Sequence, residues 1–271
     1  MLLNSGELFR GKILKRPSMR CKTPYVADVL LEDGTLTLAH TASLGCCGLC
    51  DKDAYVYMIK VENKKNVCDY KIIIANNVER NISQLIGVDP KFAENFVNCS
   101  LEQNKLSWLK NIKEFQREKT FLNSRFDFYG IDEKNQEFIL EVKNVPLADY
   151  VDMLDKDKKK LDLSGYDFND KIAYFPDGYR KKVKDTVSPR ALKHIQELQS
   201  IKKERNIRTI LCFVIQRDDV SSFQPSNIDP IYKEAVTNAY HDGVEIKAIQ
   251  VKWEINGEAN LINDDVKINI N

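Results

Sequence analysis

The chain has 271 residues, 43% of them hydrophobic and 30% charged, which is enough for one large domain or two small ones with genuine cores. Its 41 Lys and Arg nearly balance its 40 Asp and Glu, giving a formal net charge of +1. This balance excludes a globally basic chain, so a polyanion could bind only at a local patch. No stretch reaches the ~18 apolar residues of a membrane span, and the first residues show no signal-peptide pattern. We therefore expect a cytoplasmic protein with no membrane partner.

The seven cysteines do not form the dense pattern of a small disulfide scaffold. Cys46, Cys47 and Cys50 cluster in GCCGLC, and the other four are isolated. A structural zinc site needs four ligands, so this cluster alone does not define one. Reduced packing thiols and a bound metal are the two interpretations that the sequence leaves open.

Residues 7–75 consist of short runs in which apolar and polar side chains alternate, separated by turn signals. The runs are ELFRGKILK, YVADVLL, TLTLAH, AYVYMIKV and CDYKIIIA, and one of the turns is Glu32-Asp33-Gly34. Alternation at this spacing predicts a small β-barrel or sandwich.

After residue 80 the pattern changes to that of an α/β domain. Helices are predicted within 81–118, one around KFAENFVN and another near LSWLKNIKEFQRE, followed by a hairpin over 124–145. The mixed-charge stretch 149–171 has little periodicity and is predicted to be a surface insertion. We place a domain boundary near residue 80, giving domains 1–80 and 81–271.

The last third of the chain contains two well-marked helices and two strands. Ser188-Pro189 and Asp229-Pro230 each combine a capping side chain with a proline in the first turn, which predicts two helix starts. RTILCFVIQ is predicted to be a buried strand, and VEIKAIQVKWEI the last strand of the chain.

The hairpin SRFDFYGIDEKNQEFILEVKNV has an unusual charge pattern. Side chains alternate along a strand, so Glu141 and Lys143 share a face of the second strand with Ile139 and Val145. In the first strand, Arg125, Asp127 and Tyr129 are predicted to share one face, with Phe126 and Phe128 on the other.

Pairing the mixed faces of the two strands would bring Asp127, Glu141 and Lys143 together. Two neighbouring carboxylates repel each other, and a divalent cation such as Mg²⁺ would relieve the repulsion. A lysine two residues away could orient water or neutralise charge on a phosphate. The alternative is a solvated surface ion pair between Glu141 and Lys143, which would contribute little.

An Asp, a spacer and then Glu-x-Lys resembles the PD-(D/E)xK nuclease superfamily. More narrowly, the chain resembles the sugar fermentation stimulation protein family over nearly its whole length. The matching pieces, in the family's order, are YVADV, LTLAH, Glu118 ahead of SRFDF, ILEVKNVPL, YFPD, RALKH and IDPIYKEAVTNAYHDGVEIKA.

The resemblance implies an α+β protein, in which an N-terminal OB-like β-barrel precedes a restriction-endonuclease-like α/β domain with a mixed central sheet. It also implies that Asp127 and Glu141 bind the metal, Mg²⁺ or Mn²⁺, and that Lys143 is the catalytic lysine. Glu118 matches an acid on the preceding helix. Further matches expected beside the same cleft are Asp177, Arg190 and His194, and we add Arg125 as a supporting residue.

Basic residues concentrate in one part of the chain despite the neutral total. From Arg180 to Arg208 there are ten Lys or Arg residues against three acids. Such residues bind phosphates without reading sequence. The candidates for nucleic-acid contact here are Arg180, Lys181, Lys182, Lys184, Arg190, Lys193 and His194. In the barrel, Arg16, Arg20 and Tyr25 are candidates, since OB folds hold single strands on basic and aromatic surfaces.

The sequence thus predicts a Mg²⁺- or Mn²⁺-dependent nuclease that binds DNA or RNA. A non-catalytic DNA-binding regulator of sugar-utilisation genes is the main alternative, and a metal-dependent enzyme acting on a small phosphorylated ligand is a third. The oligomeric state is left open, with a homodimer as one option.

Overall fold

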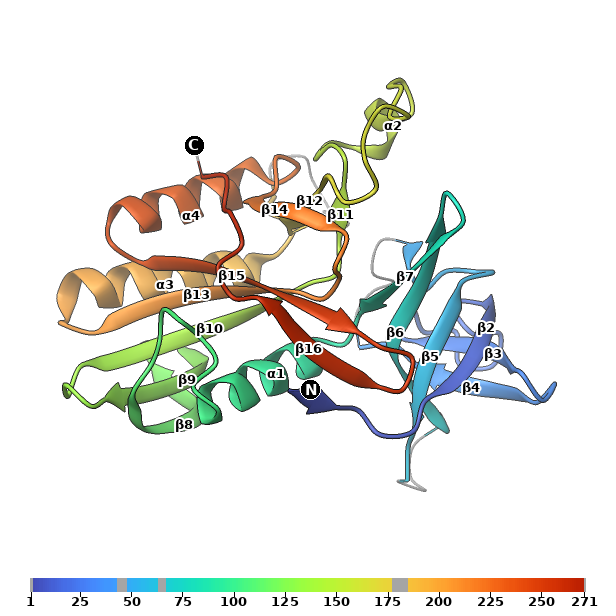
Figure 1. Cartoon of the computed structure of the whole chain (residues 1–271), viewed down its shortest axis with the longest axis horizontal. Coiled ribbons are helices and arrows are strands. Elements are labelled where there is room, and N and C mark those ends of the chain that lie inside the picture. The colour runs from blue at the N-terminus through green and yellow to red at the C-terminus, as the bar shows by residue number, and fades with distance from the viewer. Residues whose placement is uncertain (1, 43–47, 63–66, 177–184, 271) are drawn as a thin grey trace. The chain divides into compact units, whose positions relative to one another are not determined.

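The computed structural model describes residues 2–42, 48–62, 67–176 and 185–270 (Figure 1). By packing, the chain forms two compact units. The first unit contains Met1–Phe96, Gln216–Asp218 and Val251–Ile262, and the second contains Val97–Ile215, Asp219–Gln250 and Asn263–Asn271. No helix within the described ranges is long and apolar enough to cross a membrane.

A closed β-barrel forms most of the first unit. Its strands are β2 (Phe9–Lys15), β3 (Val26–Leu31), β4 (Leu36–His40), β5 (Tyr55–Lys60) and β6 (Tyr70–Glu79). β2 pairs with β3 and β5, β3 with β4, and β5 with β6, all antiparallel, while a parallel pairing of β4 with β6 closes the ring. This strand order is that of an OB fold, so the predicted OB-like barrel is confirmed.

The barrel interior is filled by the apolar side chains that alternate along its strands. Ile13, Val29, Val56 and Met58 are completely buried in it. Gly11 lies where two strands approach closely, because a Cβ atom there would be 2.5 Å from the Val29 side chain. The alternation that predicted the strands is therefore also the packing pattern of the core.

The elements that follow the barrel differ in part from the prediction. β7 (Ile82–Gly87) pairs with β6, and α1 spans Pro90–Glu102. A short strand β1 (Leu3–Asn4) pairs with β16 (Glu258–Asn263). The backbone N–H of Gly87 donates to the Gln216 carbonyl over 2.9 Å, so the first unit extends beyond the predicted boundary at residue 80 and includes later segments.

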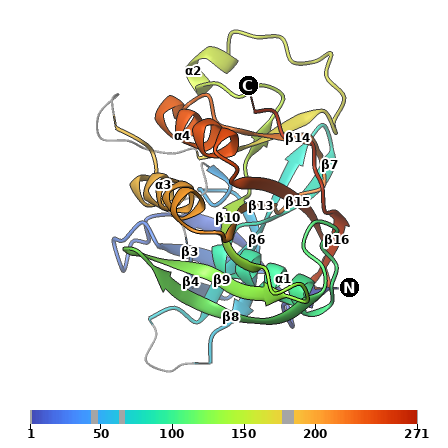
Figure 2. The same ribbon diagram turned by 90° about the vertical axis from the view of Figure 1, so that its left-hand side faces the viewer.

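The second unit contains a mixed sheet with the order β15-β13-β10-β9-β8 (Figure 2). The bounds of these strands are β8 Ile112–Phe121, β9 Ser124–Asp132, β10 Glu137–Val145, β13 Arg208–Ile215 and β15 Glu245–Trp253. β8, β9 and β10 form an antiparallel meander, whereas β10, β13 and β15 are parallel to one another. This mixed arrangement confirms the predicted α/β character of the back half.

Two helices, α3 (Pro189–Glu204) and α4 (Pro230–His241), connect the parallel strands and lie side by side (Figure 2). Their apolar residues pack on one face of the sheet, where Ile139, Leu211 and Phe213 are completely buried. Phe138 and Leu140 on the other face are also buried, so β10 is covered on both sides.

The stretch 149–171, which was predicted to be a surface insertion, connects two strands of a small second sheet. This sheet has the order β11-β12-β14, with bounds Ala148–Asp149, Lys171–Phe175 and Val220–Pro225, and a single-turn helix α2 spans Asp155–Lys158. Within the stretch, the Lys158 ammonium lies 2.8 Å from the Asp149 carboxylate. Part of the charge in this stretch is therefore paired.

Besides strand β7, which lies where only helices were predicted, two further predictions about elements are wrong. Residues 112–121 form strand β8 and not a helix, because Asn111 has a left-handed φ of 57° and the chain then joins the meander. VEIKAIQVKWEI is not the last strand, because β16 follows it after a turn at Gly257, where φ is 83°.

Candidate active site

The charged pair of the hairpin lies on the helix-covered face of the sheet. Glu141 neighbours Leu211 and Lys143 neighbours Phe213 in the parallel register of β10 with β13. The Glu141 side chain is 3% exposed and that of Lys143 is 11% exposed. Solvated surface pairing is therefore excluded, and the cost of burying these charges must be offset by specific partners.

Both partners of Glu141 bind the same carboxylate oxygen. The Lys143 ammonium lies 2.5 Å from Oε1, and Nδ1 of His194 on α3 contacts that same oxygen. Burial raises the pKa of Glu141, but the charge of Lys143 and the hydrogen bond from His194 outweigh it and lower the pKa overall. Glu141 is thus an ionised carboxylate inside the protein.

The contact with Glu141 also determines which nitrogen of the His194 ring carries the proton. An ionised carboxylate only accepts hydrogen bonds, so Nδ1 must carry the proton that it donates to Oε1. Phe126 packs on the ring, with centroids 5.7 Å apart. Nε2 is then the ring nitrogen that can bind another group, as in other carboxylate–histidine pairs.

Two buried oxygen atoms beside this cluster have no hydrogen-bond partner among the described residues. They are Oε2 of Glu141 and the hydroxyl of Tyr232, a completely buried residue of α4. Burial, then the charge of Glu141, raise the pKa of Tyr232 well above its usual value. Sequence reasoning did not single out Tyr232, because a tyrosine in the first turn of an amphipathic helix looks like an ordinary core residue.

Asp127 reaches the same strand through the backbone. Its Oδ2 accepts a hydrogen bond of 2.7 Å from the N–H of Val142, between Glu141 and Lys143. The last backbone pair of the hairpin is Leu140 with Phe128. Beyond it, the Asp127 carboxylate accepts the strand N–H in place of a backbone carbonyl. The predicted association of Asp127 with the Glu-x-Lys segment thus has a geometric basis.

The predicted faces of β9 are wrong at one position. Phe126 belongs to the core cluster of Ile139 and packs on His194, whereas Phe128 packs on Phe115, with ring centroids 6.1 Å apart. Strict alternation would put Phe126 and Phe128 on one face. It is interrupted between them because the Asp127 side chain is directed toward β10.

Glu118 lies on strand β8 and not on a helix, which corrects the expectation. It is level with Asp127, since its neighbours Arg117 and Lys119 pair with Phe128 and Phe126. Its carboxylate lies 3.4 Å from the Arg125 guanidinium, and both side chains are largely exposed. An exposed pair of this kind contributes little stability.

A pocket rich in donors adjoins this cluster. It is open, has a volume of about 450 Å³, and is lined by Asn123, Ser124, Arg125, Pro189, Arg190, Lys193 and His194. Three residues predicted to contact nucleic acid, Arg190, Lys193 and His194, are therefore brought together. Asp177, Arg180, Lys181, Lys182 and Lys184 lie outside the described residues.

The donor atoms of the cluster decide whether it fits a divalent cation. No group of three or more His, Cys, Asp or Glu side chains in the described ranges is arranged to hold a metal ion. Mg²⁺, however, is commonly held by one or two carboxylates, with water and substrate phosphate completing the shell. Asp127 and Glu141 fit that donor set, and the orphaned Oε2 of Glu141 is a buried oxygen of the right kind.

The barrel residues predicted to bind nucleic acid have different environments. Arg16 binds the Asp51 carboxylate and its side chain is 11% exposed, so its charge is engaged in an ion pair within the barrel. Arg20 is exposed. Tyr25 is exposed and stacks on His40 with ring centroids 6.4 Å apart. Burial, helped by the charge of Lys71, lowers the pKa of His40.

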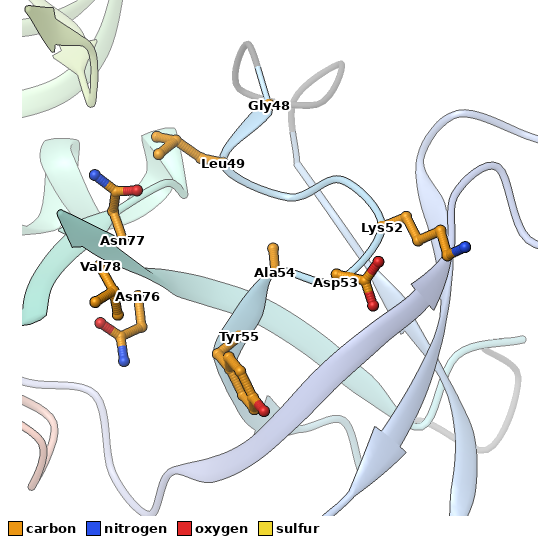
Figure 3. Close-up of a pocket in the computed structure, with 9 residues that line it drawn as sticks. All are labelled: Gly48, Leu49, Lys52, Asp53, Ala54, Tyr55, Asn76, Asn77 and Val78. Atoms are coloured by element: carbon orange, nitrogen blue, oxygen red, sulfur yellow. The ribbon is translucent and has the colours of Figure 1, made fainter. Parts of the chain in front are cut away.

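The first unit contains an open hollow that the sequence did not indicate, with a volume of about 530 Å³. Figure 3 shows the residues that line it. Lys52 points away from Asn76 and Asn77, and the Asp53 carboxylate is paired with Lys12 over 2.8 Å. No convergent charge therefore enters this hollow from the labelled residues. Cys50 nearby is buried, while Cys46 and Cys47, the other two cysteines of the GCCGLC cluster, lie outside the described residues.

Fold and site together define a class of protein: an OB barrel followed by an α/β unit whose central hairpin carries a buried Glu-x-Lys beside an aspartate. Comparison with known proteins gives the family. The family model described as "Sugar fermentation stimulation protein RE domain" matches residues 91–257. The chain belongs to the sugar fermentation stimulation protein family.

Relatives match along most of their length. A sugar fermentation stimulation protein homolog of Crocosphaera subtropica is 32% identical, over 86% of this chain and 85% of its own. A homolog of Clostridium kluyveri is 26% identical over 97% of this chain and 100% of its own. A solved structure described as Pyrococcus furiosus SfsA in complex with Ca²⁺ has a TM-score of 0.77 at 20% identity and covers 99% of each chain. That likeness supports the fold.

Proposed function

We propose that the protein hydrolyses phosphodiester bonds of DNA or RNA at the Glu141 site, with Mg²⁺ or Mn²⁺ as cofactor. The observation that carries the proposal is the ionised, buried Glu141, held by Lys143 and His194 beside Asp127. Proteins rarely keep such a charged cluster in a core without a function for it, because apolar side chains would be at least as stable there.

Asp127 and Glu141 are the residues that would hold the cation. The Pyrococcus furiosus relative is described in complex with Ca²⁺, and Ca²⁺ and Mg²⁺ both take oxygen ligands. When bound, such a cation would supply Lewis-acid stabilisation of the charge on the phosphate.

The remaining residues act by position and charge. Lys143 carries three donors, of which one is directed at Glu141 Oε1, and its ammonium also lies 3.4 Å from Nδ1 of His194. A remaining donor can bind an attacking water or a phosphate oxygen. Glu141 fixes the Lys143 ammonium and the His194 ring through one shared oxygen. The basic residues of the adjoining pocket would supply sequence-independent affinity for the strand.

A non-catalytic nucleic-acid-binding regulator is the second candidate. One observation favours it: within the described residues, three metal-binding side chains are not gathered. In that case Glu141, Lys143 and His194 would be a structural ion cluster, and binding would be independent of metal.

The test compares wild type with Glu141→Gln on labelled single- and double-stranded DNA and RNA, with Mg²⁺, with Mn²⁺ and with EDTA. The matched control is Glu133→Gln, which removes an exposed carboxylate from the turn of the same hairpin. We expect metal-dependent cleavage that falls by at least about a hundredfold in Glu141→Gln and persists in the control. Salt-sensitive binding without cleavage under any metal would contradict the proposal and support the regulator.

A further inference from the structure

The pocket beside His194 is built mainly from hydrogen-bond donors. Arg125, Arg190, Lys193 and Ser124, whose side chains all carry hydrogen-bond donors, are among the residues that line it. Such a set selects a ligand with several acceptor oxygens and negative charge, which describes a phosphate.

The cations of the pocket are unequally neutralised. Arg125 lies 3.4 Å from the Glu118 carboxylate, and Lys193 donates to the Asn123 carbonyl over 2.6 Å and lies 3.8 Å from Glu197. Arg190 is exposed and has no ion-pair partner among the described residues. A positive charge is therefore available at the mouth of the pocket, and Arg190 carries it.

Ser124 is a further residue of the pocket wall. It is 5% exposed, and its hydroxyl oxygen is shielded from solvent and has no hydrogen-bond partner within the described ranges. An unpaired buried hydroxyl costs free energy, so an acceptor oxygen brought within its reach would remove that cost.

The first turn of α3 adds to this arrangement. Pro189 has no N–H, and the N–H of Ala191 donates to the Ser188 side chain. Arg190 is thus the residue of the first turn that can present both a backbone N–H and a guanidinium to an anion. The positive end of the helix dipole acts in the same direction.

His194 connects the pocket with the candidate active site, because it lines the pocket and its Nδ1 contacts Glu141. We propose that the pocket is a phosphate subsite for the strand, adjacent to the phosphate that is cleaved. The proposal rests on the proposed function for its substrate class. Its ligand is one of two groups: the terminal phosphate of a strand, which is a dianion, or an internal phosphodiester.

The experiment measures binding in EDTA, so that it does not depend on cleavage. Short single-stranded oligonucleotides labelled at the 3′ end, with either a 5′-phosphate or a 5′-hydroxyl, are titrated with protein and followed by fluorescence anisotropy at several salt concentrations. Arg190→Gln is the test variant. Lys203→Gln removes one charge from the last turn of the same helix and is the control.

We expect Arg190→Gln to weaken binding by about tenfold and Lys203→Gln to leave it within about twofold. A 5′-phosphate preference that disappears in Arg190→Gln identifies a terminal-phosphate site. Equal loss for both oligonucleotides, with a shallower salt dependence, identifies an internal phosphodiester.

Wild-type binding in Arg190→Gln, equal losses in both variants, or no binding by wild type would each overturn the proposal. Circular dichroism melts of both variants control for misfolding. If cleavage fails while the Arg190 effect persists, hydrolysis is wrong and the subsite stands.

Discussion

At the scale of single residues, the two oxygens of Glu141 have different environments. Oε1 receives Lys143 and His194, whereas Oε2 has no hydrogen-bond partner among the described residues. The first oxygen explains how the charge is tolerated inside the protein, because two donors offset its desolvation. The second is the oxygen that can bind a cation or substrate. A single side chain thereby combines a structural and a chemical contact.

Tyr129 provides a prediction in the same hairpin. Its hydroxyl donates to the Glu137 carboxylate, and this hydrogen bond, with burial and the charges of Glu137 and Glu114, raises the pKa of Tyr129 to about 12. The folded state thus holds the phenolic proton more tightly than the unfolded chain, whose tyrosines titrate near pH ~10. The stabilisation is complete below about pH 10 and is lost as pH rises through the folded pKa of about 12.

We expect Tyr129→Phe to lower the free energy of unfolding by about 1 kcal/mol at pH 8, because the hydrogen bond to Glu137 is lost. The difference from wild type should shrink as pH rises above about 10. Urea unfolding across this pH range measures it, with the exposed Tyr240→Phe as control. A difference that is independent of pH would show that only packing was changed.

At the scale of elements, the two helices that cover the site begin in similar ways. Ser188 caps α3 through a bond of 3.4 Å to the N–H of Ala191. Asp229 caps α4 over 3.1 Å to the N–H of Tyr232 and also accepts hydrogen bonds from Thr186 and the N–H of Val187, 2.6 and 2.7 Å long. The carboxylate of Asp229 therefore ties the segment before α3 to the start of α4.

Removing these caps should have unequal effects. We expect Asp229→Ala to cost about 2 kcal/mol, because a charged cap and two further hydrogen bonds are lost, and Ser188→Ala about 0.5 kcal/mol. Chemical denaturation of both variants gives the values. Equal losses would mean that the contacts of Asp229 to Thr186 and Val187 contribute nothing.

Much of the fold could be predicted because its pattern is local. Apolar and polar side chains alternate along the barrel strands, and each helix start is marked by a capping residue followed by proline. β8 could not be predicted, since a bulge between Ile112 and Glu114 shifts the register. The half-buried residues Ile112 and Phe115 are therefore three positions apart in the sequence, a spacing that is typical of one face of a helix. The signal for β16 is Asn256-Gly257, a typical hairpin turn.

The site was predictable in part for the same reason. Glu141 and Lys143 share a face by alternation, and Asp127 follows from the hairpin register. His194 was a candidate through resemblance, but its contact with Glu141 joins residues from distant parts of the chain. The buried hydroxyls of Ser124 and Tyr232 carry no sequence signal, because only the tertiary packing removes their partners.

At the scale of the whole molecule, a bound cation should be visible as stability. A ligand that binds only the folded state adds about 2.7 kcal/mol at a hundred times its Kd. We expect Mg²⁺ or Ca²⁺ to raise the Tm of wild type and of Glu133→Gln, but not of Glu141→Gln. Differential scanning calorimetry with and without EDTA measures the shifts. The same rise in Glu141→Gln would locate the bound cation elsewhere.

The first unit is assembled from three separate stretches of the chain, which affects how it folds during synthesis. The Gln216 carbonyl accepts the N–H of Gly87 over 2.9 Å, and the Gln216 side chain accepts the indole N–H of Trp253 over 3.0 Å. During synthesis the barrel strands leave the ribosome first, yet these contacts must wait until residue 253 has been added. At about 5–20 residues per second, that delay is on the order of ten seconds or more. The part of the protein that is translated first is therefore among the last to be completed, and a fragment ending at residue 80 would lack the segments that finish it.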